Sequence, residues 1–293
     1  MVFDKLLEIC KKENKQIYEI MQEKEAYTFE VSIADIREKT SKNISAMKEA
    51  IISGLCSNEK SFSGLCGDDT SKLKERFKNK PALFGNLFEK ITTYALATME
   101  ENLRMNKIVA CPTAGSCGIV PAVIIALAQE KDITVDNEIN ALITAGTIGY
   151  IISSKVAMAG AVAGCQAECG VASAMSAGAA VYLLNGTNEQ IINAAGLALK
   201  NVLGLTCDPV GGLVEIPCVK RNAFLAVHAI TAAELILADV ESKIPADEIV
   251  DAMVQTGQLM SPLLKETSQG GLATTKSGQH IKLKLEQMYN SLL

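Results

Sequence analysis

Apolar residues recur every three to four positions along most of the chain, with charged residues between them. This spacing is clearest in residues 2–23 and 33–54, where an apolar stripe lies opposite a charged face, as in an amphipathic helix. The same spacing predicts later helices over residues 82–106, 189–203, 218–239 and 247–260. Convincing alternation with a period of two, which would indicate strands, does not occur. The pattern therefore predicts an all-α fold.

Between residues 141 and 184 the pattern gives way to a run rich in Gly, Ala and Ser with few charges. A helix that is apolar on every side is typically buried, so this region predicts central helices. Four Gly-rich segments interrupt the helices: CPTAGSCGIVP, GCQAECG, GLTCDPVGGLVEIPC and ETSQGGLATTKSGQ. Because binding and catalytic residues concentrate on loops held by rigid elements, we expect the function to lie in these segments.

The composition favours one helical domain over residues 1–293, with the N-terminal helices (1–54) as candidates to pack on a partner chain. Aromatic residues make up 4% and Trp is absent, so the core depends on aliphatic and small side chains. A net charge of −5 disfavours nucleic-acid binding. The charged N-terminus differs from a secretory signal, and no apolar stretch reaches the roughly 20 residues that span a bilayer. We therefore expect a cytoplasmic protein that binds no membrane.

Nine cysteines give the chain its most distinctive chemistry. Disulfides are rare in a reducing cytoplasm, and an odd number of cysteines argues against a disulfide framework. Cys165, Cys207 and Cys218 each stand beside a break in the helical pattern. Thiolates bind iron–sulfur clusters and zinc, although only Cys165 and Cys169 have the close spacing of a zinc knuckle. Spacing alone leaves a cluster, a zinc site and inert buried thiols open.

Positively charged residues follow the last of these cysteines. Pro217 suits the start of a helix, whose N-terminal N–H groups would point at the loop, and Lys220 and Arg221 come next. Cationic side chains favour thiolates and can hold a substrate carboxylate through charge-assisted hydrogen bonds. Lys220 and Arg221 are therefore predicted to bind substrate, with a solvated first helical turn as the alternative.

The chain resembles the α chain of bacterial two-chain iron–sulfur L-serine dehydratases in four segments that occur in the same order: ACPTAGSCGIVPA, GCQAECGVASAM, GLTCDPVGGLVEIPCVKRNA and KETSQGGLAT. The resemblance implies a [4Fe-4S] cluster whose three protein ligands fall on Cys165, Cys207 and Cys218. It implies that the fourth iron is open and acts as a Lewis acid on the β-hydroxyl of L-serine. The expected products are pyruvate and ammonia.

Further site residues come from the Gly-rich segments. Those predicted to offer hydroxyls or backbone N–H groups to the substrate carboxylate are Thr113, Ser116, Gly270 and Gly271, with plain caps and turns as the alternative. Gln166 and Glu168 flank the first proposed ligand and are predicted to hydrogen-bond cluster sulfurs or the substrate ammonium. No catalytic base is assigned, because His228 lies among apolar helix residues and His280 in a polar terminal segment.

The family carries a Ser-Ser-His-Thr-type motif in its β part, and this chain lacks that motif. We therefore expect a β chain as partner, within an oligomer. The chain also departs from the family at Asp68 and Ser268, which replace glycines, and at four extra cysteines: Cys66, Cys111, Cys117 and Cys169. Cys169 is either an alternative ligand or a small buried side chain. Two other functions stay open, a cysteine-degrading iron–sulfur lyase and a non-catalytic subunit that binds a cluster or zinc.

Overall fold

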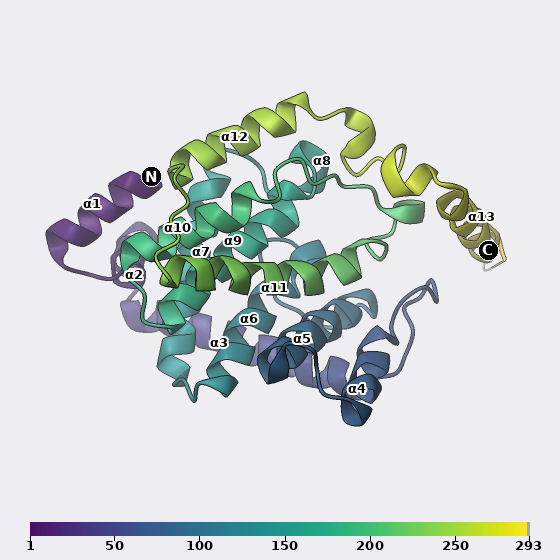
Figure 1. The fold of residues 1–293 in the computed structure, drawn as a ribbon, viewed down its shortest axis with the longest axis horizontal. Helices are drawn as coiled ribbons and strands as arrows, with labels where there is room; N and C mark the ends of the chain where they lie inside the picture. The colour runs from purple at the N-terminus through teal and green to yellow at the C-terminus, as the bar shows by residue number, and fades with distance from the viewer. Residues whose placement is uncertain (292–293) are drawn as a thin grey trace.

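A computed structural model describes residues 1–291, and within them the fold is all-α, as the apolar spacing predicts. The helices are α1 (Phe3–Glu13), α2 (Ile17–Phe29), α3 (Ile33–Cys56), α4 (Asp69–Asn79), α5 (Gly85–Leu103), α6 (Ile119–Glu130), α7 (Val135–Ser153), α8 (Gly160–Ala163), α9 (Val171–Leu183), α10 (Asn188–Lys200), α11 (Cys218–Leu237), α12 (Ala246–Leu259) and α13 (Lys276–Asn290). Helices α1 and α13 lie at opposite ends of the long axis (Figure 1). No helix among these residues is both long and apolar enough to cross a membrane.

Helix α9 forms the centre of the core, in contact with α6, α7, α10 and α11 (Figure 1). Its sequence, VASAMSAGAAVYL, is dominated by small residues, and all but one of its side chains are buried. Gly178 shows why small residues are needed, because a Cβ there would lie 2.2 Å from Ile148 Cδ1 of α7. The Gly/Ala-rich run therefore forms central helices, as predicted, and its small side chains permit close helix packing.

The N-terminal region differs from the prediction in one respect. Residues 2–23 were expected to form one helix, but Asn14 adopts a left-handed conformation (φ 53°) and ends α1. Asn tolerates this conformation better than most residues, and hydrophobic spacing carries no information about it. Phe3, Leu6 and Ile17 are buried in the main core of the chain. Packing of residues 1–54 on a partner chain stays a prediction.

Helix α4 begins inside the polar segment that follows α3. Its first N–H groups are satisfied from α5, where the buried Glu100 carboxylate accepts hydrogen bonds from Asp69 N at 2.8 Å and Thr70 N at 3.2 Å. Arg104 directly follows α5 as its C-cap and donates to Gly67 O at 2.7 Å and Glu59 O at 2.8 Å. A buried ionic group on α5 therefore fixes the loop before α4.

Two glycines on neighbouring helices test the importance of close packing. A Cβ at Gly54 of α3 would lie 2.3 Å from the Ala97 carbonyl oxygen of α5, and backbone cannot move aside easily. We expect Gly54→Ala to lower the free energy of unfolding by roughly 1–3 kcal/mol, the usual cost of overpacking. At Gly146 of α7 no atom lies within 4 Å, so Gly146→Ala should raise it by roughly 0.5–1 kcal/mol through helix propensity. Urea denaturation under reducing conditions measures both, and equal effects would contradict the packing argument.

Candidate active site

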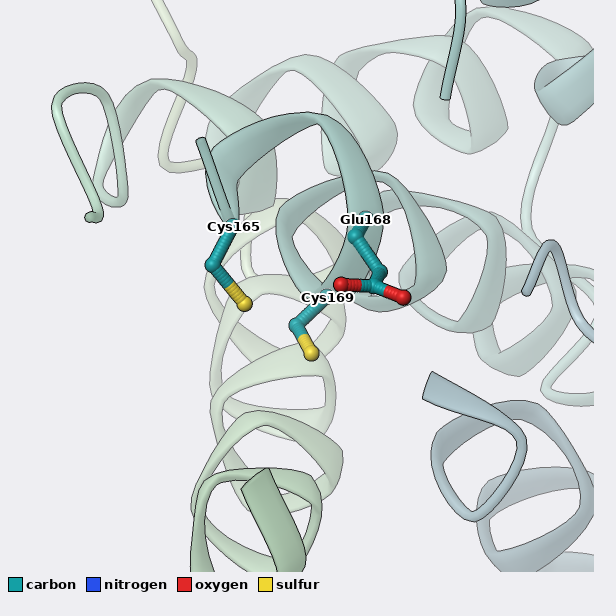
Figure 2. A group of neighbouring side chains, drawn as sticks. All are labelled: Cys165, Glu168 and Cys169. Atoms are coloured by element: carbon teal, nitrogen blue, oxygen red, sulfur yellow. The ribbon is translucent and has the colours of Figure 1, made fainter. Parts of the chain in front are cut away.

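The segment after α8 forms a wide turn that gathers three ligand-type side chains. Gly164 ends α8 with φ 75°, and residues 166–170 form a π-helical turn in which Gly170 N donates to Cys165 O at 3.1 Å. As a result Cys165, Glu168 and Cys169 point into the same space (Figure 2), and their ligand atoms all lie within 4.8 Å of one another. Such π-turns are frequent at functional sites.

Cys207 lies on the loop after α10, which pairs with the C-terminal loop. Cys207 N donates to Leu264 O at 2.9 Å, and Glu266 N donates to Cys207 O at 2.7 Å. The Cys207 thiol packs against α8 at Gly160, where a Cβ would lie 2.6 Å from the sulfur. The pairing therefore places Cys207 between α8 and residues 264–266.

Cys218 is the first residue of α11, as predicted, and Asn222 follows one turn later. The fully buried Asn222 amide donates to Gly115 O and Cys218 O, both at 2.9 Å, and accepts from Gly118 N at 3.0 Å. This side chain joins the CPTAGSCG segment to the helix that carries Cys218. Asn222 is not among the residues predicted from the sequence, although its i+4 spacing from Cys218 places it on the same helical face.

The three predicted ligand thiols are buried and close enough to influence one another electrostatically. Burial raises the pKa of Cys218 to about 12 and also raises the pKa of Cys207. The pKa of Cys165 is lowered instead, first by a hydrogen bond from the Cys169 thiol and then by the Arg221 guanidinium. Cys165 is therefore the thiol best suited to be a thiolate, which is the form that binds metals.

Lys220 and Arg221 are neighbours in sequence but face different surroundings. The Arg221 side chain is 14% exposed, lies beside Cys165, and donates to Thr206 O at 2.9 Å and to Asp208 Oδ1 at 3.4 Å. The Lys220 side chain is 49% exposed, forms an ion pair with Asp69, and lies 3.8 Å from Cys66 Sγ. Of the two cations, Arg221 is the one beside the predicted ligands.

Asp208 connects the cysteine loop to the second pair of predicted glycines. Its Oδ2 accepts from Leu272 N at 2.8 Å, and a Cβ at Gly271 would lie 2.5 Å from the same oxygen. Gly271 also has φ 57°, a left-handed conformation that side chains disfavour. Both the backbone conformation and the close approach of Asp208 therefore favour glycine at this position. Gly270 is extended and packs against Leu263 O. Asp208 directly follows Cys207 and is not among the residues predicted from the sequence.

The remaining predicted residues divide into two groups. The Thr113 hydroxyl hydrogen-bonds Glu168 Oε1, next to Cys165 and Cys169, and burial raises the pKa of Glu168. Ser116 is fully buried and its hydroxyl donates to Cys111 O at 3.1 Å. The Gln166 amide donates to Met253 O at 3.1 Å and accepts from Gly204 N at 2.9 Å. Thr113 and Glu168 therefore face the thiols, whereas Ser116 and Gln166 satisfy backbone groups.

The two histidines lie elsewhere. His228 is partly buried on α11, with Nε2 2.9 Å from Ala198 O, and His280 is exposed on α13. Within residues 1–291 all nine cysteines are free thiols. The donor set fits a soft metal centre, because three buried thiols from three segments lie near enough to influence one another electrostatically and Gly160 leaves room for the Cys207 sulfur.

Known proteins are similar to this chain in sequence over almost its full length. A family model described as serine dehydratase alpha chain matches residues 12–273. The chain belongs to the serine dehydratase alpha chain family. A probable L-serine dehydratase alpha chain of Bacillus subtilis is 42% identical over 96% of this chain and 93% of that protein. The L-serine dehydratase alpha chain of Peptoniphilus asaccharolyticus is 38% identical over 94% and 95%, respectively.

Some serine dehydratases that match this chain are longer than it is. An L-serine dehydratase of Helicobacter pylori is 37% identical over 92% of this chain, but the match covers only 60% of that protein. The family resemblance stated from the four segments is therefore confirmed, and it extends well beyond those segments.

Asn222 offers a direct test of how the site is held together. Asn222→Ala would leave the buried Gly118 N–H without its partner and would leave Gly115 O with the Cys169 thiol as its only donor, and one unpaired buried group costs about 1–3 kcal/mol. We expect a loss of stability of at least that size in urea denaturation. The matched control is Asn79→Ala, which removes a solvent-exposed hydrogen bond to Glu75 O and should change stability by less than about 0.5 kcal/mol. Similar values for both variants would argue against this role of Asn222.

Proposed function

We propose that this chain is the catalytic α chain of an iron–sulfur L-serine dehydratase, which converts L-serine to pyruvate and ammonia. The observation that carries the proposal is the meeting of three buried thiols from separate segments beside one buried arginine. Membership of the family supports the substrate, because relatives along its full length are named L-serine dehydratase alpha chains.

Cys165, Cys207 and Cys218 are the proposed protein ligands of a [4Fe-4S] cluster. Three ligands for four irons leave one iron free of protein, and a cluster bound in this way supplies Lewis acidity for departure of the β-hydroxyl. Ligands of a cluster bind different irons, so they need not approach one another as closely as the ligands of a single ion. The burial of all three thiols and their mutual electrostatic influence support this assignment.

The chain's own polar groups would bind and orient L-serine. Arg221 is the proposed partner of the substrate carboxylate, because its guanidinium is buried beside Cys165 and oriented by Asp208 and Thr206 O. The Glu168 carboxylate, held by the Thr113 hydroxyl, is a suitable acceptor for the substrate ammonium. Burial of these groups excludes water and strengthens both interactions.

A β chain completes the enzyme in this proposal. The closely matching relatives are named alpha chains, and the longer Helicobacter pylori protein contains about two fifths of additional sequence. This chain lacks the Ser-Ser-His-Thr-type motif of the family's β part, so the base that removes the α-proton and the substrate-binding groups are expected to come partly from the partner. An α chain that turns over serine at the full rate alone would contradict this.

The cluster can be tested by iron and acid-labile sulfide analysis on chain purified without oxygen. We expect near-stoichiometric iron and sulfide in the wild type and loss of both in Cys165→Ser, Cys207→Ser and Cys218→Ser, because each removes a proposed ligand. Cys56→Ser is the control, since Cys56 is exposed and far from the motif segments in sequence. Full retention of iron in the three variants would contradict the ligand assignment.

The two neighbouring cations give a second test, in the holoenzyme with its β chain. Arg221→Lys should lower kcat/KM for L-serine by roughly 10–100-fold, the equivalent of one lost charge-assisted hydrogen bond. Lys220→Met should change it by less than about 3-fold, because Lys220 pairs with Asp69 on the outer side. Pyruvate formation measures both, and a larger effect at Lys220 would reverse the assignment. Replacing L-serine with L-cysteine in the same assay tests the related lyase activity.

A further inference from the structure

Cys165, Glu168 and Cys169 form a tighter group than the proposed cluster needs. Only Cys165 of the three is a proposed cluster ligand, yet the ligand atoms of all three lie within 4.8 Å of one another. We propose that in the cluster-free chain these three side chains bind a single soft divalent cation of the zinc type. The inference rests on this local geometry and does not depend on the proposed serine dehydratase activity.

The distances suit one ion. A tetrahedral zinc site with Zn–S bonds of about 2.3 Å places two sulfur ligands about 3.8 Å apart. Small side-chain rotations would bring the three ligand atoms from their present separations to that geometry. The π-helical turn is the reason they start so close, since it directs residues 165, 168 and 169 into the same space (Figure 2).

The surroundings hold the carboxylate ready for an ion. The Thr113 hydroxyl binds one oxygen of Glu168 and leaves the other oxygen available. The absence of a side chain at Gly115 is required for this position, because a Cβ there would lie 2.6 Å from Glu168 Oε1. An outer hydrogen bond of this kind orients a metal ligand and increases affinity. Three protein ligands leave a fourth position for water or an added ligand.

Charge and softness both favour the proposed ion. Two thiolates and a carboxylate carry three negative charges, which a divalent cation and the neighbouring Arg221 guanidinium balance. Binding releases the thiol protons to solvent, and the ion is neither oxidised nor reduced. Thiolate ligands select zinc-like ions over magnesium or calcium.

Cys165 belongs to both sets of ligands, so the two occupants exclude each other. An ion held by Cys165, Glu168 and Cys169 would remove one of the three proposed cluster ligands. We therefore expect zinc-type ions to slow the assembly of a cluster on this chain. Cys169 makes this competition possible, and it is not itself required by the proposed cluster.

Titration of the cluster-free chain with Co²⁺ under reducing, anaerobic conditions tests the site. Tetrahedral Co²⁺ bound to thiolates gives strong d–d and sulfur-to-cobalt charge-transfer absorption. Added Zn²⁺ should displace the Co²⁺ and abolish this absorption. We expect one Co²⁺ per chain in the wild type. Cys169→Val and Glu168→Gln should weaken binding by more than the roughly 10–100-fold that the loss of an outer partner costs. Circular dichroism checks that each variant is folded.

Cys207→Ser and Cys218→Ser are the matched controls, because each removes a buried thiol of the same region that lies outside the trio. They should retain Co²⁺ binding while losing iron and sulfide, whereas Cys169→Val should lose Co²⁺ binding and still take up iron and sulfide. Wild-type affinity for Co²⁺ in Cys169→Val would overturn the proposed ion site. Absence of iron and sulfide in the wild type, with Co²⁺ binding intact, would instead overturn the cluster.

Discussion

Three side chains on one face of helix α11 hold the other site segments in place. Cys218, Arg221 and Asn222 stand at positions i, i+3 and i+4, which are neighbours on a helical surface. Asn222 fixes the CPTAGSCG segment, Arg221 binds the loop around Cys207, and Cys218 contributes its thiol. Lys220, at i+2, faces outward and meets α4 instead. The period of the helix therefore separates two adjacent cations into different roles.

The site also depends on the rigidity of what lies behind it. Helix α9 follows directly on the π-helical turn and is surrounded by four other helices. Its alanines and glycine have no rotamers to lose and permit short distances between helix axes. The thiols of the π-turn are thus attached to a helix at the centre of the core. Polar side chains at the site are satisfied by hydrogen bonds with partners that are distant in sequence, such as Gln166 with Met253 O.

Hydrophobic spacing was sufficient to predict most of the helices and the all-α fold, because burial of one helical face is a local property of the sequence. It did not predict α4, whose sequence DTSKLKERFKN is mostly polar and has one buried residue. It failed at Asn14, where a single left-handed residue divides a continuous apolar stripe. The cysteines and Arg221 could be recognised by residue type. The i+4 spacing placed Asn222 on the same helical face as Cys218, but its partner Gly115 is brought close only by the fold. The same holds for Asp208 and its partner Leu272. The π-helical turn could not be predicted either, because the extra residue in the turn does not change the composition of the segment.

The pairing of Cys207 with residues 264–266 has a consequence for the order of assembly. A nascent chain leaves the ribosome from its N-terminus, so all three thiols emerge before the C-terminal loop. Until that loop arrives, the Cys207 backbone lacks its partners at Leu264 and Glu266, and Asp208 lacks Leu272 N. The surroundings of the Cys207 thiol are therefore complete only after residues 264–272 have been synthesised, which is well after the thiol itself has emerged.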